Sequence, residues 1–136
     1  MHHPHQPPPQ QGLTLIELLI VVTIVGILSM VAVPGFQTYL RAAHRAEGMI
    51  QLTRIAHQLE RFYTERNTYS GFDAVTFPVT TEGGRYRITH SADSATMFTL
   101  TATAQNDQIH DDEHGVSCAT LTLDASGATT PAVCWR

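Results

Sequence analysis

One acidic side chain, Glu17, opens an otherwise apolar stretch near the N-terminus. The sequence reads Gly-Leu-Thr-Leu-Ile-Glu from Gly12 to Glu17, and no further charged residue follows before Arg41. A carboxylate near the centre of a bilayer costs about 2.5–3.5 kcal/mol on insertion scales, so a carboxylate in such a segment needs a compensating partner. Thr14 and Glu17 also fit a capping box, in which each side chain accepts a hydrogen bond from the other residue's backbone amide. The two interpretations are compatible, and both stay open.

A second polar cluster lies at residues 106–115 and reads Asn-Asp-Gln-Ile-His-Asp-Asp-Glu-His-Gly. Carboxylate oxygens and imidazole nitrogens are ligand types for divalent cations. The weak candidates for such ligands are His110, Asp111, Asp112, Glu113 and His114. The cluster lacks the regular aspartate spacing of a calcium loop, and runs of charge commonly face water. We therefore expect a solvated acidic loop between strands and no metal site.

The remaining polar residues show no arrangement typical of catalysis. The sequence has no nucleophile elbow, phosphate-binding loop or zinc signature. His44 and His57 fall in a helical pattern, where a surface or packing position explains them. We expect a protein that is not an enzyme and binds no cofactor.

The charge of the chain is unevenly divided. All eight basic residues among the 136 are arginines, and the net charge is −4. Residues 13–66 hold five arginines and four glutamates, a net charge of +1, whereas residues 67–136 hold three arginines and eight acids, a net charge of −5. A surface with this excess of acids repels phosphate on average. Nucleic acid is therefore not an expected partner.

Two hydrophobic patterns follow one another in a single predicted helix, residues 13–66. Residues 13–33 are almost wholly apolar and would span about 31 Å as a helix, close to the hydrocarbon thickness of a bilayer. Gly26 and Pro34 interrupt this run, as membrane helices tolerate. From residue 37 onward, apolar residues recur every three or four positions, which is typical of a helix packed on a sheet.

The second half of the chain predicts a small antiparallel sheet. Residues 67–84 are rich in Thr, Gly and aromatic residues, and breakers of regular structure at 67, 71, 78, 83 and 84 predict a loop. Tyr69, Phe72 and Phe77 would pin this loop to the body. Alternating apolar and polar residues and a turn at 124–127 predict strands at 85–89, 97–104, 119–123 and 128–130. One helix packed on such a sheet is an α+β fold.

The junction at Gly12–Glu17 and the apolar helix after it resemble the processing site of type IV prepilins. The resemblance implies that a prepilin peptidase cuts between Gly12 and Leu13 and methylates the new amine of Leu13. It implies that Glu17 pairs with the Leu13 amine of a neighbouring subunit during assembly. It also implies that Gly26 and Pro34 bound a segment that loosens when subunits pack into a filament.

The C-terminal run, Cys118-Ala-Thr-Leu-Thr-Leu-Asp followed by Cys134-Trp135, looks like that of PilE-type type IVa minor pilins and small type IVa pilins. In a chain delivered across a membrane, an even pair of cysteines is typical of a disulfide, and two separate buried thiols are the alternative. Cys118 and Cys134 are not arranged as a C-x-x-C motif.

The resemblance implies a leader peptide at 1–12, a transmembrane and filament-core helix at 13–36 and a globular pilin head at 37–136. The prepilin would wait in the inner membrane until the pilus assembly machinery adds it to an extracellular fibre on a Gram-negative-type cell surface. Expected partners are prepilin peptidase and other pilin subunits, and expected roles are pilus biogenesis, adhesion or twitching motility. The alternatives are a DNA-receptor minor pilin for natural transformation and a pseudopilin of type II secretion.

Overall fold

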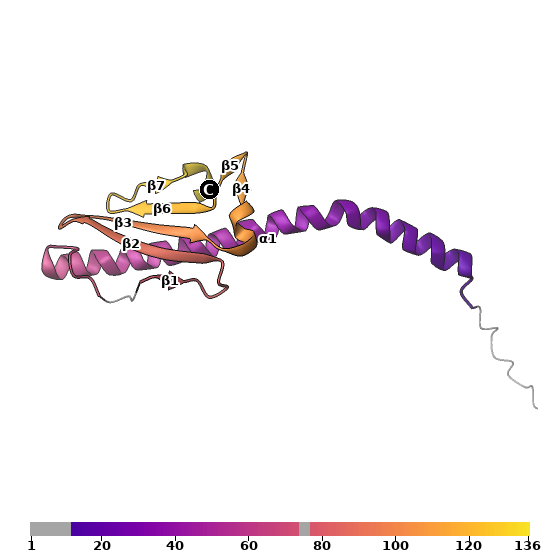
Figure 1. The fold of residues 1–136 in the computed structure, drawn as a ribbon, viewed down its shortest axis with the longest axis horizontal. Coiled ribbons are helices and arrows are strands. Elements are labelled where there is room, and N and C mark those ends of the chain that lie inside the picture. Colours follow the sequence, from indigo (N-terminus) through magenta and orange to yellow (C-terminus); the bar gives the residue numbers. More distant parts are fainter. Residues whose placement is uncertain (1–11, 74–76) are drawn as a thin grey trace, which may run out of the picture. The chain divides into compact units, whose positions relative to one another are not determined.

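The computed structural model describes residues 12–73 and 77–136. The chain divides into two compact units, residues 1–36 and residues 37–136, and we call the second unit the head. One helix, α1 (Leu15–Arg66), contributes to both units (Figure 1). The expected leader peptide lies outside the described residues except for Gly12.

In the first unit, a capping box forms the start of α1. The Thr14 hydroxyl oxygen accepts a hydrogen bond from the Glu17 amide at 3.3 Å, and Glu17 Oε2 accepts one from the Thr14 amide at 3.4 Å. Because Thr14 acts as the cap, the helix begins two residues later than predicted. The helix continues through Gly26 and Pro34. Among the described residues, α1 is the one helix long and apolar enough to cross a membrane by length and composition.

In the head, the C-terminal part of α1 packs on one face of a five-stranded antiparallel sheet with the order β1-β2-β3-β6-β7 (Figure 1). The strands are β1 (Val79–Thr80), β2 (Tyr86–Ser94), β3 (Met97–Ala104), β6 (Thr120–Asp124) and β7 (Thr129–Thr130). Outside this sheet lie the 3-10 helices η1 (Asn106–His110) and η2 (Ala132–Trp135) and a hairpin of β4 (Asp112–Glu113) and β5 (Val116–Ser117). The predicted α+β fold is confirmed.

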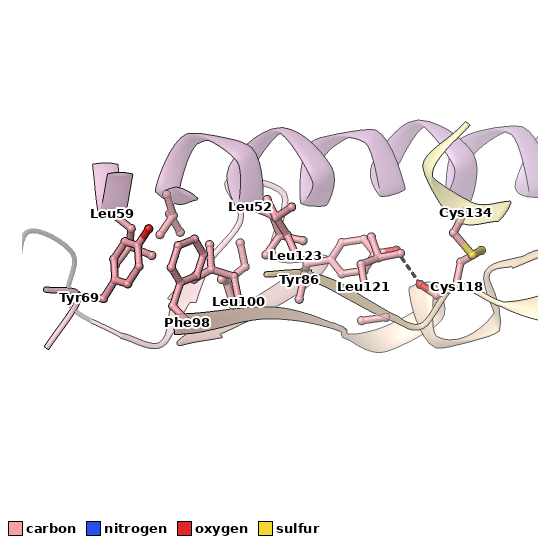
Figure 2. Packing of buried hydrophobic residues seen from close by; sticks show 14 residues of the cluster. Leu52, Leu59, Tyr69, Tyr86, Phe98, Leu100, Cys118, Leu121, Leu123 and Cys134 are labelled. Carbon is pink, nitrogen blue, oxygen red and sulfur yellow. Dashed lines mark hydrogen bonds between the residues drawn. A yellow bond between two sulfur atoms is a disulfide. The ribbon is translucent and has the colours of Figure 1, made fainter. Parts of the chain in front are cut away.

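The strand alternation seen in the sequence sets which side chains enter the core. Phe98, Leu100 and Ala102 of β3 are buried, and the threonines between them face the other side of the sheet. They meet the apolar face of α1, as Figure 2 shows for Leu52 and Leu59. Strand β2 continues to Ser94, five residues beyond its predicted end, and its pairing with β3 is irregular between Ser91 and Ser94.

The connection between α1 and β2 is pinned by aromatic contacts, as predicted. Tyr69 is buried, and its ring stacks on Tyr63 at 4.6 Å and meets the edge of Phe98 at 4.8 Å between centroids. Phe72 and Phe77 also make ring contacts, to Phe62 and His90. Strand β1 within this connection was not predicted, because two residues after a proline carry no readable alternation.

Candidate functional site

The N-terminal motif occupies the first turn of α1 and the residues before it. Gly12, Leu13 and Thr14 precede the helix and are exposed, so the expected cleavage point lies in accessible backbone. Glu17 is exposed, and among the described residues it forms no ion pair. Its carboxylate is held only by Thr14, through the amide and hydroxyl at 3.4 Å. The described chain therefore supplies no counter-charge for Glu17.

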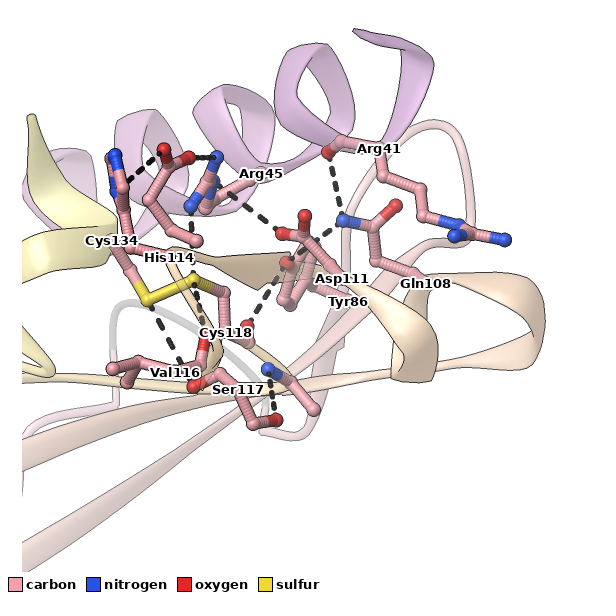
Figure 3. Close-up of a disulfide and its surroundings, with 12 residues drawn as sticks. Arg41, Arg45, Tyr86, Gln108, Asp111, His114, Val116, Ser117, Cys118 and Cys134 are labelled. Atoms are coloured by element: carbon pink, nitrogen blue, oxygen red, sulfur yellow. Dashed lines mark hydrogen bonds and ion pairs between the residues drawn. A yellow bond between two sulfur atoms is a disulfide. The ribbon is translucent and has the colours of Figure 1, made fainter. Parts of the chain in front are cut away.

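The head contains a buried arginine, Arg45 of α1, at the centre of an ion-pair network (Figure 3). Its guanidinium lies 3.4 Å from Asp111 Oδ2 and 2.7 Å from Glu113 Oε2. Its third nitrogen donates to Cys118 Sγ at 2.9 Å. The side chains of Arg45 and Asp111 are only 7% and 2% exposed, so each depends on the other to offset the cost of leaving water.

Polar groups beside Arg45 extend the network across the end of the sheet. The Tyr86 ring covers Gly48, where an added Cβ would lie 3.0 Å from the ring. The Tyr86 hydroxyl donates to the Cys118 carbonyl at 3.4 Å and accepts from Gln108 Nε2 at 3.1 Å. Burial raises the pKa of Tyr86 to about 12, so the hydroxyl stays protonated as a donor. The same Gln108 amide donates to the Arg41 carbonyl at 2.8 Å, which ties η1 to α1.

One helical turn before Arg45, Arg41 binds Asp107 through two parallel hydrogen bonds of 3.0 and 3.1 Å. The guanidinium lowers the pKa of Asp107, and Arg45 likewise lowers the pKa of Glu113. Burial instead raises the pKa of Asp111, although Arg45 opposes this shift. The three carboxylates differ because only Asp111 is withdrawn from water.

The expectation of a solvated acidic loop at 106–115 was wrong for its central residues. The segment forms η1 and the β4–β5 hairpin, and it places Asp107, Asp111 and Glu113 against α1. Arg41 and Arg45 are four residues apart, as are Asp107 and Asp111, and this matched spacing was the signal in the sequence. It was missed because the two pairs are 66 residues apart.

Among the five candidate metal ligands, the structure commits two acids to Arg45. His114 Nδ1 lies 3.2 Å from Glu113 Oε1, and His110 and Asp112 are exposed. Within residues 12–73 and 77–136, no group of three or more His, Cys, Asp or Glu side chains is placed to hold a metal ion.

A disulfide joins Cys118, just before β6, to Cys134 in η2 (Figure 3). Both cysteines are buried, and the Arg45 guanidinium contacts the Cys118 sulfur. The bond therefore links the C-terminal segment to the buried ion-pair network.

The outer face of the sheet, which points away from α1, carries hydroxyl groups and one exposed arginine, Arg87. Register partners across the strands form two rows: Thr80, Arg87, Thr103 and Thr120, then Thr89, Thr101, Thr122 and Thr130. Arg85 lies two residues before Arg87 and is half-buried. Among the described residues, neither Arg85 nor Arg87 forms an ion pair. A net charge summed over residues 67–136 does not reveal this local surface.

Comparisons with known proteins place the chain among type IV pilins. A family model described as "Type IV minor pilin ComP, DNA uptake sequence receptor" matches residues 34–122, and the prokaryotic N-terminal methylation motif matches residues 8–33. The type IV major pilin PilA of Myxococcus xanthus is 37% identical over 65 residues, which cover 48% of this chain and 30% of that protein. The fimbrial protein EcpC of Eikenella corrodens is 30% identical over 77 residues, which cover 57% of this chain and 50% of that protein.

The solved structure of a type IV pilin from Shewanella oneidensis matches the fold. It aligns with a TM-score of 0.55 and 26% identity, and covers 71% of this chain and 98% of the other. The chain spans half or less of the two curated relatives, whereas the solved pilin is covered almost completely.

Proposed function

The chain belongs to the family of type IV minor pilins described as ComP, DNA uptake sequence receptor, and from this membership we propose that it is a pilus subunit that captures DNA. The pilin fold and the N-terminal methylation motif agree with a structural subunit that is not an enzyme. The family match to residues 34–122 carries the proposal, because it covers the head from the middle of α1 into β6. The family match gives no support to the alternative of a type II secretion pseudopilin.

This proposal conflicts with the expectation that nucleic acid is not a partner. That expectation used the net charge of −5 on residues 67–136. Three of the eight acids there, Asp107, Asp111 and Glu113, are paired with Arg41 and Arg45 of α1. The sum therefore overstates the negative charge that a DNA strand would meet on the sheet.

DNA binding can be measured with the full chain in an uncharged detergent, by fluorescence anisotropy. The probes are sheared chromosomal DNA of the source organism and unrelated DNA of matched base composition. We expect binding that weakens steeply between about 50 and 200 mM salt, because phosphate contacts release counterions. A receptor for an uptake sequence should also prefer the source DNA. Absence of binding to either DNA at low salt would refute the proposal.

We further propose the assembly route that the N-terminal motif implies. Prepilin peptidase would remove residues 1–12 and methylate Leu13, and the subunit would pass from the inner membrane into an extracellular pilus. The accessible backbone at Gly12 and Leu13 and the exposed apolar side chains of residues 13–36 support this route. In the fibre, Glu17 would pair with a neighbour's Leu13 amine, and Gly26 and Pro34 would bound the segment that loosens.

Cleavage gives a direct prediction. Mass spectrometry of the protein from sheared fibres should find Leu13 as the first residue, carrying one added methyl group. Replacing Gly12 with a large residue should leave the leader attached and the protein in the membrane fraction. Fibres containing the intact leader would contradict this route.

A further inference from the structure

We propose that Cys134 is the sulfur at which a small thiol attacks the disulfide, and that Cys118 leaves as a thiolate held by Arg45. The disulfide is then a site of thiol–disulfide exchange with one preferred direction of attack. Two properties of the sulfurs, the groups that face them and the attachment of their backbones, point to the same direction.

The two sulfurs differ in the groups that face them (Figure 3). The Val116 carbonyl oxygen lies 3.7 Å from Cys118 Sγ, and the Ser117 carbonyl oxygen lies 3.9 Å from Cys134 Sγ. Cys118 Sγ also accepts an N–H of the Arg45 guanidinium at 2.9 Å. A guanidinium N–H stabilises a thiolate, whereas a carbonyl oxygen disfavours one. Cys118 is therefore the better leaving group, because exchange is faster when the leaving thiol ionises more readily.

The acids of the network leave this N–H to the sulfur. Asp111 and Glu113 lie against the other two nitrogens of Arg45, Nε at 3.4 Å and Nη2 at 2.7 Å. Nη1 is the nitrogen that donates to Cys118. The two carboxylates offset the charge of Arg45, so its effect on the sulfur is that of one directed, buried N–H. A thiolate formed at Cys118 would find this donor already in place.

The backbone of Cys118 is tied to distant elements, whereas that of Cys134 is held within its own turn. The Cys118 amide donates to the Asp111 carbonyl at 2.9 Å, and the Cys118 carbonyl accepts from the Tyr86 hydroxyl at 3.4 Å. The Cys134 amide donates to the Pro131 carbonyl at 3.0 Å, at the start of η2. Lifting η2 therefore uncovers Cys134 while these bonds of Cys118 stay in place.

Trp135, the neighbour of Cys134 in η2, gives a physical reason for η2 to open. Its indole Nε1 is buried and has no hydrogen-bond partner among the described residues. A buried donor without an acceptor is unfavourable, and water would satisfy it once η2 lifts. Cys118 and Cys134 are 0% and 1% exposed, so a thiol reaches Cys134 through such a local opening.

The exchange takes place in two balanced steps. A thiolate forms a bond to Cys134 Sγ, the bond between Cys118 and Cys134 breaks, and its electron pair stays on Cys118 Sγ. A second thiolate then attacks the sulfur of the first thiol in this mixed disulfide. This step releases the oxidised thiol as a disulfide and leaves Cys134 as a thiolate, which takes a proton from water. The reverse sequence forms the bond, with the same small disulfide as the oxidant.

The first test locates the mixed disulfide. The folded full chain in an uncharged detergent is mixed with reduced glutathione at neutral pH, quenched at intervals with acid and maleimide, and mapped by mass spectrometry. We expect glutathione on Cys134 in about ten-fold or greater excess over Cys118. Equal adducts on the two cysteines, which reduction after complete unfolding would also give, overturn the proposed direction. A disulfide that glutathione does not open in the folded chain overturns it as well.

The second test measures the part played by Arg45. Arg45→Met/Asp111→Leu removes the donor to the sulfur and the buried acid together, and should slow reduction by glutathione about three- to ten-fold. Loss of packing alone would loosen the head and speed reduction, so a slower rate separates the two causes. Arg41→Met/Asp107→Leu removes the ion pair one helical turn earlier and should keep the wild-type rate. If Arg45→Met/Asp111→Leu is reduced as fast as the wild type or faster, Arg45 does not hold the leaving thiolate.

Discussion

Arg45→Ala should lower the free energy of unfolding of the head by about 3–5 kcal/mol, because it leaves the Asp111 carboxylate buried without its counter-charge. The Asp111 side chain is 2% exposed, and Arg45 is the cation that lies against it. Unfolding by guanidinium can be followed through the single tryptophan, Trp135, which is partly buried next to the disulfide. Arg54→Ala, at an exposed position of the same helix, should change stability by less than about 0.5 kcal/mol.

Two further measurements assign this loss to charge. Burial raises the folded-state pKa of Asp111 above the ordinary value of 3.8, and Arg45 opposes that shift. A raised folded pKa means that the protonated acid is favoured in the folded state, so Arg45→Ala should be most stable in acid. It should lose stability as the pH rises through the folded pKa of Asp111. Arg45→Met/Asp111→Leu removes both charges and should recover much of the loss. A double variant as unstable as Arg45→Ala would mean that Arg45 acts by packing alone.

Glu17→Val should reduce the amount of this subunit in fibres by about two orders of magnitude. In the proposed bundle of helices, the Leu13 amine of a neighbour would lose its counter-charge, and a cation at such depth costs about 2.5–3.5 kcal/mol. The contacts described for Glu17 are with Thr14 of the same unit, so we expect the stability of the head to stay unchanged. Immunoblots of sheared fibres against the membrane fraction measure the effect.

Thr14→Val is the matched control for Glu17→Val. It removes the hydroxyl of the capping box and leaves the carboxylate in place, at a cost of about 0.5–2 kcal/mol to the helix start. Its incorporation into fibres should stay near the wild-type level. Wild-type amounts of Glu17→Val protein in fibres would mean that the pairing does not recruit the subunit, and Glu17 would then serve only as a cap.

Local patterns in the sequence predict those elements whose residues alternate or repeat over several positions. Strand β3 was placed at its observed bounds, because four apolar residues face inward between threonines. The end of α1 at Arg66 was also predicted. In the structure Asn67 takes a positive φ of 54°, which stops the helix there. The two-residue strands β1, β4 and β5 could not be predicted, because their pairing depends on distant partners.

The same difference between local patterns and distant partners applies to the charged sites. The Gly12–Glu17 motif is contiguous, so the sequence displays it directly. The Arg45 network joins residues that meet only when the chain folds. In the sequence, its acids therefore look like part of a solvated loop. The outer face of the sheet was not predicted for a related reason. A net charge does not say where each charge lies, whereas Arg87 is exposed on the sheet and Asp111 is buried beside Arg45.

The long sequence separation within the Arg45 network also sets an order of events during synthesis. Glu113 and Cys118 follow Arg45 by 68 and 73 residues. At typical rates of translation, about 3–15 s pass between the emergence of the arginine and that of its partners. Throughout this interval the cation of Arg45 on α1 lacks the acids that offset its burial. We expect the end of the head nearest Arg45 to close last, and chains that end before Asp111 should leave Arg45 exposed.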